Sequence, residues 1–182
     1  MKLIFFILFS SLTFSSSARI MTYNILNYQD DNQREANYID ILTEIEPNIL
    51  IIQEILGNEG FLNFKEDVLD ILNPNQWSSA NFTNQSAQQD IALYYYHDMF
   101  TLLESNVVET AQSSGTRDVI EWVLMHNSSE VEFNIYGAHF KASSGNSNAQ
   151  QRLEEATILR NHLNQLAENT LFILAGDLNI YS

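Results

Sequence analysis

The stretch Ile49-Leu-Ile-Ile-Gln-Glu-Ile55 decides the fold class. Four aliphatic residues in succession, three of them β-branched, are typical of a strand that is buried on both faces. Such a strand needs helices or a second sheet on each side, so the run predicts a layered α/β domain. Glu54 comes at the carboxyl end of this strand, the end at which α/β sheets place their ligand-binding groups.

Upstream of this strand, the sequence predicts another strand and a helix. Residues 19–23 form a short apolar-leaning strand candidate that ends at Asn24. Residues 33–46 carry apolar side chains at helical spacing, and Pro47 ends the helix. The chain therefore opens with a strand-helix-strand unit.

Downstream, the pattern is helical, then β-rich, then mixed. Apolar residues from Phe61 to Leu72 predict a second helix that Asn73-Pro74-Asn75 closes. Further strands are expected at 91–96, 102–109, 119–125 and 131–139, a helix at 149–168 and a final strand at 171–175. This order indicates α/β layers in which one sheet packs on another and the helices lie outside.

Composition limits the classes of function. The 182 residues are 45% hydrophobic, which suffices for one domain with its own core. The formal net charge of -15 argues against a broad basic patch for nucleic acid, although bound cations can reverse the local field at a nuclease site. Because the chain has no cysteine, disulfides and thiolate zinc sites are excluded.

The first eighteen residues resemble a secretory leader. A short basic start precedes the apolar run of residues 3–9, and small residues lead to Ala18. The apolar run is shorter than the roughly 20 residues that span a bilayer. We therefore expect a signal peptide at 1–18, a mature chain from Arg19 with no transmembrane segment, and a secreted or periplasmic location. A buried first strand or an uncleaved anchor is the alternative.

Polar side chains recur where the predicted strands stop. They are Asn24, Glu54, His139, Asp177 and Asn179. Each has a simpler interpretation by itself, since Asn, Asp and Gly are common turn residues and a histidine can be a hydrogen-bonded core residue. Glu54 is the hardest to explain in this way, because an ionised carboxylate next to a core is costly unless it is paired or bound to metal.

Together these residues lie in four segments that resemble the signature blocks of the endonuclease/exonuclease/phosphatase superfamily, which has the deoxyribonuclease I-like fold. The segments are Met21-Thr-Tyr-Asn-Ile25, Ile51-Ile-Gln-Glu-Ile55, Tyr136-Gly-Ala-His-Phe-Lys141 and Leu174-Ala-Gly-Asp-Leu-Asn179. The resemblance runs from about Arg19 to the last residue. It implies a four-layer α/β/β/α sandwich and hydrolysis of phosphate esters with Mg²⁺, or Mn²⁺, as cofactor.

The resemblance also implies a role for each residue. Glu54 would bind the metal, with Asn24 beside it as a ligand or support, because hard oxygen donors suit such ions. His139 would donate to a phosphate oxygen and Asp177 would orient or deprotonate the attacking water. Asn179 would hold the phosphorus centre as the reaction proceeds.

Arg117, in Gly115-Thr-Arg-Asp118, resembles the arginine with which this superfamily contacts the phosphate. The alternative is a surface arginine paired with Asp118. Lys141 is a weaker candidate, since a solvated lysine after a strand is common.

The sequence departs from the superfamily pattern at its carboxyl end. The superfamily carries a further Asp-His pair there, whereas this sequence stops soon after the Asp-x-Asn block, and His162 lies in a predicted helix without matching context. We therefore expect residues 19–182 to be an incomplete domain in which the last strands of the second sheet are missing.

The expected function is that of a secreted, metal-dependent nuclease that directs a water in line at a phosphodiester. Its partners would be nucleic acid or another phosphate-ester substrate, and no stable protein partner is implied. Two alternatives stay open: a member acting on sphingomyelin-like or inositol phosphates, and an inactive fold fragment that serves as a binding module.

Overall fold

The computed structural model describes residues 17–30, 33–85, 87 and 89–181. The expected leader at 1–18 lies outside these residues except for Ser17 and Ala18, which are exposed. Within the described part of the chain, no helix is both long and apolar enough to cross a membrane.

The first sheet has four strands in the order β1-β2-β4-β3. The two strands β1 and β2 are parallel, as expected for strands joined by a helix, and the other pairs are antiparallel. The strands are β1 (Ile20–Tyr28), β2 (Ile49–Ile55), β3 (Trp77–Ser79) and β4 (Asp90–Tyr96).

The second sheet also has four strands, in chain order β5-β6-β7-β8. Three are antiparallel, and β8 adds parallel to β7 after a helical crossover. The strands are β5 (Phe100–Val108), β6 (Val119–His126), β7 (Val131–His139) and β8 (Phe172–Asp177).

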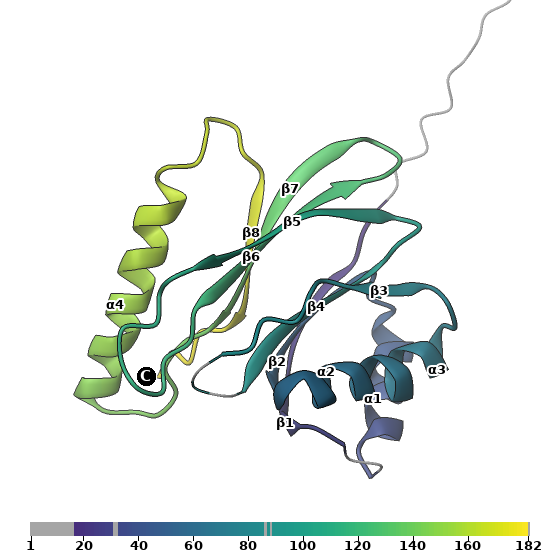
Figure 1. Cartoon of the computed structure of the whole chain (residues 1–182), viewed down its shortest axis with the longest axis horizontal. Helices are drawn as coiled ribbons and strands as arrows, with labels where there is room; N and C mark the ends of the chain where they lie inside the picture. Colours follow the sequence, from purple (N-terminus) through teal and green to yellow (C-terminus); the bar gives the residue numbers. More distant parts are fainter. Residues whose placement is uncertain (1–16, 31–32, 86, 88, 182) are drawn as a thin grey trace, which may run out of the picture.

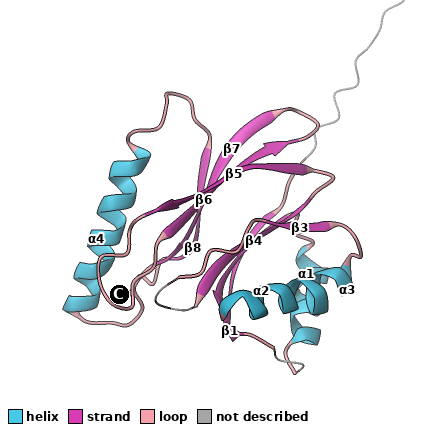
Figure 2. Ribbon diagram, in the orientation of Figure 1, coloured by secondary structure: helices cyan, strands magenta, loops and turns pink. Residues whose placement is uncertain are grey.

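Helices cover the outer face of each sheet (Figures 1 and 2). On the first sheet lie α1 (Glu35–Ile45), α2 (Gly57–Phe64), a π-helical turn η1 (Lys65–Leu69) and α3 (Asp70–Leu72). On the second sheet lies α4 (Asn146–Leu163). The predicted four-layer α/β/β/α sandwich is confirmed.

Three apolar layers fill the spaces between the four layers of the fold. The central layer joins the two sheets and includes Ile49, Ile51 and Trp122, all at most 1% exposed. One close approach fixes its thickness: a Cβ added to Gly137 of β7 would lie 2.5 Å from the Trp122 ring. Glycine is therefore required where this indole packs.

Several element boundaries differ from the sequence-based expectation. The strand β1 continues past Asn24 to Tyr28, because a bulge lets pairing with β2 resume. The strand β3 was missed, since three residues give too short a pattern to detect. The helix α4 ends at Leu163 rather than 168, where a turn follows.

The strand β8 lies at the edge of the second sheet and carries exposed apolar residues. Those on and around it are Leu171, Phe172, Leu174, Ile180 and Tyr181. Leu174, Ile180 and Tyr181 also line a cavity of about 520 Å³ against α4. Apolar surface is thus open at this edge of the second sheet.

Candidate active site

Three of the predicted residues meet where β1 has its bulge and where β2 and β8 reach their carboxyl ends. The side-chain amide of Asn24 donates to Glu54 Oε1 at 2.9 Å and to Asp177 Oδ2 at 3.1 Å. Asn24 and Glu54 belong to the first sheet and Asp177 to the second, so the site is built across the interface between the two sheets. An amide can serve two carboxylates because its nitrogen carries two protons.

A bulge in β2 sets the direction of Glu54. Gln53 pairs with Ile91 of β4 and Ile55 pairs with Asp90, so Glu54 is the extra residue. Its φ of 68° is unusual for a residue other than glycine. The bulge leaves the carboxylate 13% exposed at the end of an otherwise buried strand. Such local strain is commonly kept at functional sites.

Asp177 is fixed by the close contact of β8 with β7. Gly176, at φ 146°, approaches Ala138 so closely that an added Cβ would lie 1.9 Å from the Ala138 carbonyl oxygen. In this register Asp177 pairs with His139, and both lie at the same edge of the sheet. The predicted catalytic pair therefore results directly from parallel pairing of β7 and β8.

His139 is buried beside the acidic group, with Nε2 3.9 Å from Glu54 Oε1. Burial lowers the pKa of His139, and the charge of Arg117 lowers it further, while Glu54 and Asp177 oppose the shift. A neutral imidazole still donates through one ring nitrogen. The His139 imidazole therefore lies close enough to Glu54 for both side chains to contact one ligand.

Arg117 is buried rather than at the surface, which contradicts the alternative of a surface arginine paired with Asp118. Its guanidinium donates to Gln89 Oε1. The Gln89 amide in turn donates to Asn27 Oδ1 at 2.6 Å and faces Glu54 Oε2 at 3.4 Å. Burial lowers the pKa of Arg117, and nearby carboxylates oppose this shift.

Asn179 is tied to the site through its backbone, whose N–H donates to Asp177 Oδ1 at 3.0 Å. Its side chain is turned to other partners: Nδ2 donates to the Phe140 carbonyl at 3.0 Å, and Oδ1 accepts from the Tyr181 hydroxyl at 3.0 Å. One amide proton is left for a ligand. Its predicted contact with phosphate stays a prediction.

The weaker candidate Lys141 and the excluded His162 contact groups other than Glu54 and Asp177. The Lys141 ammonium lies next to Gly115, in the loop that carries Arg117. His162 lies on α4 with Nε2 3.8 Å from Glu121 Oε1, within a separate polar cluster. The expectation that His162 does not complete the site is consistent with this position.

Sequence reasoning missed three polar residues around Arg117: the half-buried Gln89 and the buried Asp90 and Glu155. Asp90 is 1% exposed and accepts from the backbone N–H groups of Gly57 and Gln85. Burial raises its pKa. A signal existed in the sequence, since Asp90 directly precedes the apolar run of β4 and Glu155 lies four residues before Leu159 on the apolar face of α4.

The donor set fits a hard divalent cation. The described residues hold no group of three or more His, Asp or Glu arranged around one point. Magnesium does not need one, because it keeps several waters and binds one or two carboxylates. Four carboxylates, from Glu54, Asp90, Glu155 and Asp177, act on the single charge of Arg117. Glu54 and Asn24 supply oxygen donors of the kind that a hard divalent cation prefers.

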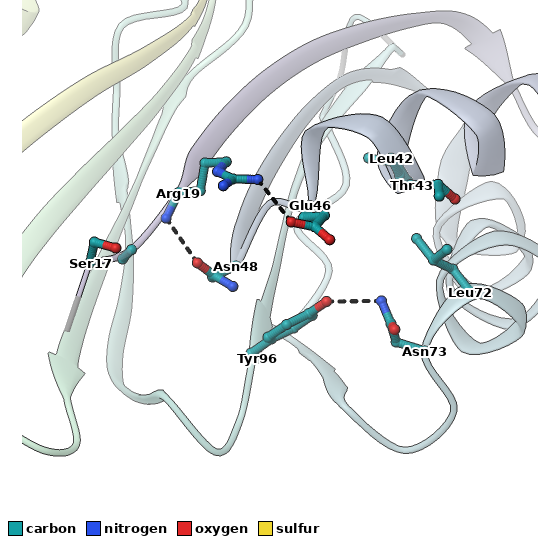
Figure 3. A pocket seen from close by; sticks show the side chains of 10 residues that line it. Ser17, Arg19, Leu42, Thr43, Glu46, Asn48, Leu72, Asn73 and Tyr96 are labelled. Atoms are coloured by element: carbon teal, nitrogen blue, oxygen red, sulfur yellow. Dashed lines mark hydrogen bonds and ion pairs between the residues drawn. The ribbon is translucent and has the colours of Figure 1, made fainter.

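The cavities of about 540 and 520 Å³ are not lined by Glu54, His139 or Asp177. The larger of the two opens at the amino ends of β1 and β2, where Arg19 bonds to Glu46 and Asn48 and Tyr96 bonds to Asn73 (Figure 3). A smaller one of about 220 Å³ lies beside Asn24 and includes Arg34. We place the candidate site by its chemistry, because the larger cavity contains one exposed ion pair and no converging carboxylates.

Comparison with known proteins bears on the fold. No family model matches the chain, and neither does any curated protein. Solved structures do match, at low sequence identity. They include D. rerio TDP2 complexed with a single-strand DNA product (TM-score 0.67, 14% identity) and the human Nocturnin catalytic domain with bound sulfate (TM-score 0.67, 21% identity). A Bacteroides thetaiotaomicron endonuclease/exonuclease/phosphatase family protein matches with TM-score 0.67 and 15% identity.

These matches cover 92%, 90% and 90% of this chain but only 63%, 64% and 64% of the respective structures. The chain thus spans less than two thirds of the length of each. The likeness confirms the deoxyribonuclease I-like fold that the four sequence blocks predicted.

Proposed function

We propose that this chain, with its deoxyribonuclease I-like fold, carries the active site of a metal-dependent phosphoesterase, and that its substrate is a phosphodiester of nucleic acid. One observation carries the proposal. Asn24, Glu54, His139 and Asp177 come from four different strands of two sheets and meet within hydrogen-bond or ion-pair distance. Packing alone gives no reason to gather two carboxylates and a buried imidazole there.

Each residue has a role that its position allows. Glu54 and Asn24 would hold Mg²⁺ or Mn²⁺, which when bound supplies positive charge to the phosphate oxygens. Asp177 accepts a proton from the attacking water or aligns it. His139 donates a hydrogen bond to a non-bridging oxygen, and Arg117 adds a fixed positive charge as the phosphorane forms.

Substrate choice rests on the neighbours and on charge. TDP2 is seen with single-strand DNA product, and another neighbour is a mannosyl-6-phosphatase from Bacteroides thetaiotaomicron. The chain has only 8 Lys and Arg against 23 Asp and Glu, so a nucleic acid would be gripped at the scissile phosphate rather than along a basic surface.

We extend the proposal to export, with cleavage after Ala18. The backbone N–H of Arg19 donates to Asn48 Oδ1 at 2.9 Å, whereas Ser17 and Ala18, the first two described residues, are exposed. Mass spectrometry of the exported protein would show Arg19 as its first residue. A cell-retained protein that keeps its first eighteen residues would contradict this part of the proposal.

The test of the reaction is hydrolysis of plasmid DNA and of bis-p-nitrophenyl phosphate. We expect activity with Mg²⁺ or Mn²⁺, none with EDTA, and losses of about 100-fold or more in Glu54→Ala and His139→Ala. Glu44→Ala is the matched control, since Glu44 is exposed on α1. Activity that survives EDTA, or that both site variants retain, would refute the proposal.

A further inference from the structure

Glu155 is a buried carboxylate that the proposed reaction does not use. It lies on α4 and is 1% exposed, whereas its neighbour Glu154 is exposed. Glutamate is almost never fully buried unless partners compensate for its lost hydration. The partners of Glu155 therefore indicate why the carboxylate is kept inside.

Those partners are the two segments that carry the phosphate-facing residues. Oε2 accepts the backbone N–H of Lys141 at 2.9 Å, two residues after His139. The backbone N–H of Arg117 faces the same carboxylate. Burial raises the pKa of Glu155, and these two amides together with the charges of Arg117 and Lys141 oppose that shift.

Arg152, almost one turn earlier on α4, holds the same segment from its carbonyl side. Its guanidinium donates to the carbonyls of Lys141 and Ser143, both at 2.8 Å. Helix α4 thus makes three hydrogen bonds to the segment after His139: Glu155 accepts one N–H, and Arg152 donates to two carbonyls. Glu155 connects this segment with the one that ends in Arg117, and the Lys141 ammonium also lies beside Gly115 of that second segment.

We propose that Glu155 is a positioning residue: as a hydrogen-bond acceptor for Lys141 and Arg117, it sets the distance between the Arg117 loop and the His139 segment. The proposal rests on the proposed function, because these two segments would hold the same phosphate group. A 1 Å error in such placement can cost about 100-fold in rate.

Two variants separate a hydrogen-bonding role from a role as a buried charge. Glu155→Gln removes the charge and keeps an acceptor at the same reach. Glu155→Asp keeps the charge and draws the acceptor back by one methylene, roughly 1.5 Å. Positioning predicts that Gln is tolerated and Asp is not, whereas charge compensation for Arg117 predicts the reverse.

The experiment measures kcat and KM for bis-p-nitrophenyl phosphate with Mn²⁺, and hydrogen exchange of residues 111–118 and 140–143. In Glu155→Asp we expect KM to rise about tenfold, with faster exchange in both segments. Glu155→Gln is expected to stay within about threefold of the wild type, and Glu154→Gln is the control on the same helix.

Unchanged exchange and KM in Glu155→Asp would overturn the proposal, as would a larger loss in Glu155→Gln than in Glu155→Asp. An inert wild type would overturn the proposed function and, with it, the catalytic meaning of this contact. The exchange data would still show whether Glu155 joins the two segments, so the two failures are distinguishable.

Discussion

Asn24 donates to Asp177 at 3.1 Å although 153 residues separate them. The same amide donates to Glu54, so one neutral side chain holds two carboxylates from different sheets together. A carboxylate in place of this amide would repel both.

Asn24→Asp therefore places a third negative charge between Glu54 and Asp177. We expect the variant to melt several degrees below the wild type in EDTA, because like charges at this distance repel. Added Mg²⁺ or Mn²⁺ should recover most of the difference, since a ligand that binds only the folded state stabilises it. Differential scanning fluorimetry with and without metal measures both effects. A variant that melts like the wild type in EDTA would contradict the convergence of these charges.

Arg117→Lys keeps a positive charge but loses the planar fork that bonds Gln89. We expect KM for bis-p-nitrophenyl phosphate to rise about tenfold or more with a smaller change in kcat, because phosphate recognition depends on two parallel donors. Steady-state kinetics decides this. Arg160→Lys on α4 is the control, and equal kinetics in the two variants would remove Arg117 from the site.

Gly176→Ala should destabilise the chain by about 3 kcal/mol or more, since strain and collision add. The added Cβ would lie 1.9 Å from the Ala138 carbonyl oxygen, and the φ of 146° disfavours any side chain. Gly57→Ala measures the cost of backbone strain without a collision, because Gly57 has φ 68° with open space around it. We expect that control to cost about 1 kcal/mol in urea unfolding. Equal losses would mean that the contact with β7 relaxes.

Glu121 provides a pH dependence outside the site. Burial would raise its pKa, but hydrogen bonds from Tyr136 at 2.5 Å, Asn134 at 2.9 Å and Asn106 at 3.2 Å lower it below its ordinary 4.5. At pH values between the lower folded pKa and the ordinary pKa of 4.5, Glu121 thus binds fewer protons in the folded state than in the unfolded state. Its stabilisation is complete above pH 4.5 and is lost as the pH falls through the lower folded value.

Glu121→Gln should accordingly cost about 2 kcal/mol at pH 7 and progressively less below pH 4.5. Urea unfolding at several pH values checks this, with exposed Glu132→Gln as the control. The comparison is repeated in a His162→Gln background, because His162 faces the same carboxylate. A difference that stays constant down to pH 3 would contradict the assignment.

The sequence predicted the layers and the meeting of the main site residues for physical reasons. The run Ile49–Ile52 could only be a strand covered on both sides, and Pro47 could only end the preceding helix. Parallel pairing then brings the ends of β1 and β2, and of β7 and β8, to common edges. Asn24, Glu54, His139 and Asp177 follow from that topology.

The features that the sequence could not predict depend on contacts between distant segments. The bulge that turns Glu54 has no local signal, since positive φ at a glutamate is stabilised only by the surrounding sheet. The side chain of Asn179 turns to Phe140 and Tyr181, whereas the family resemblance implied a contact with phosphate. Glu155 stands out on the apolar face of its helix, but the sequence does not reveal its partner in the segment after His139.

The packing of Trp122 against Gly137 affects the geometry of the proposed site. Asn24 and Glu54 belong to one sheet and Asp177 to the other. The thickness of the central apolar layer therefore sets the distance between the proposed site residues of the two sheets. Bulk added at Gly137 would spread the sheets and increase that distance without touching a polar atom. The geometry of the proposed site thus depends on the packing of the apolar core.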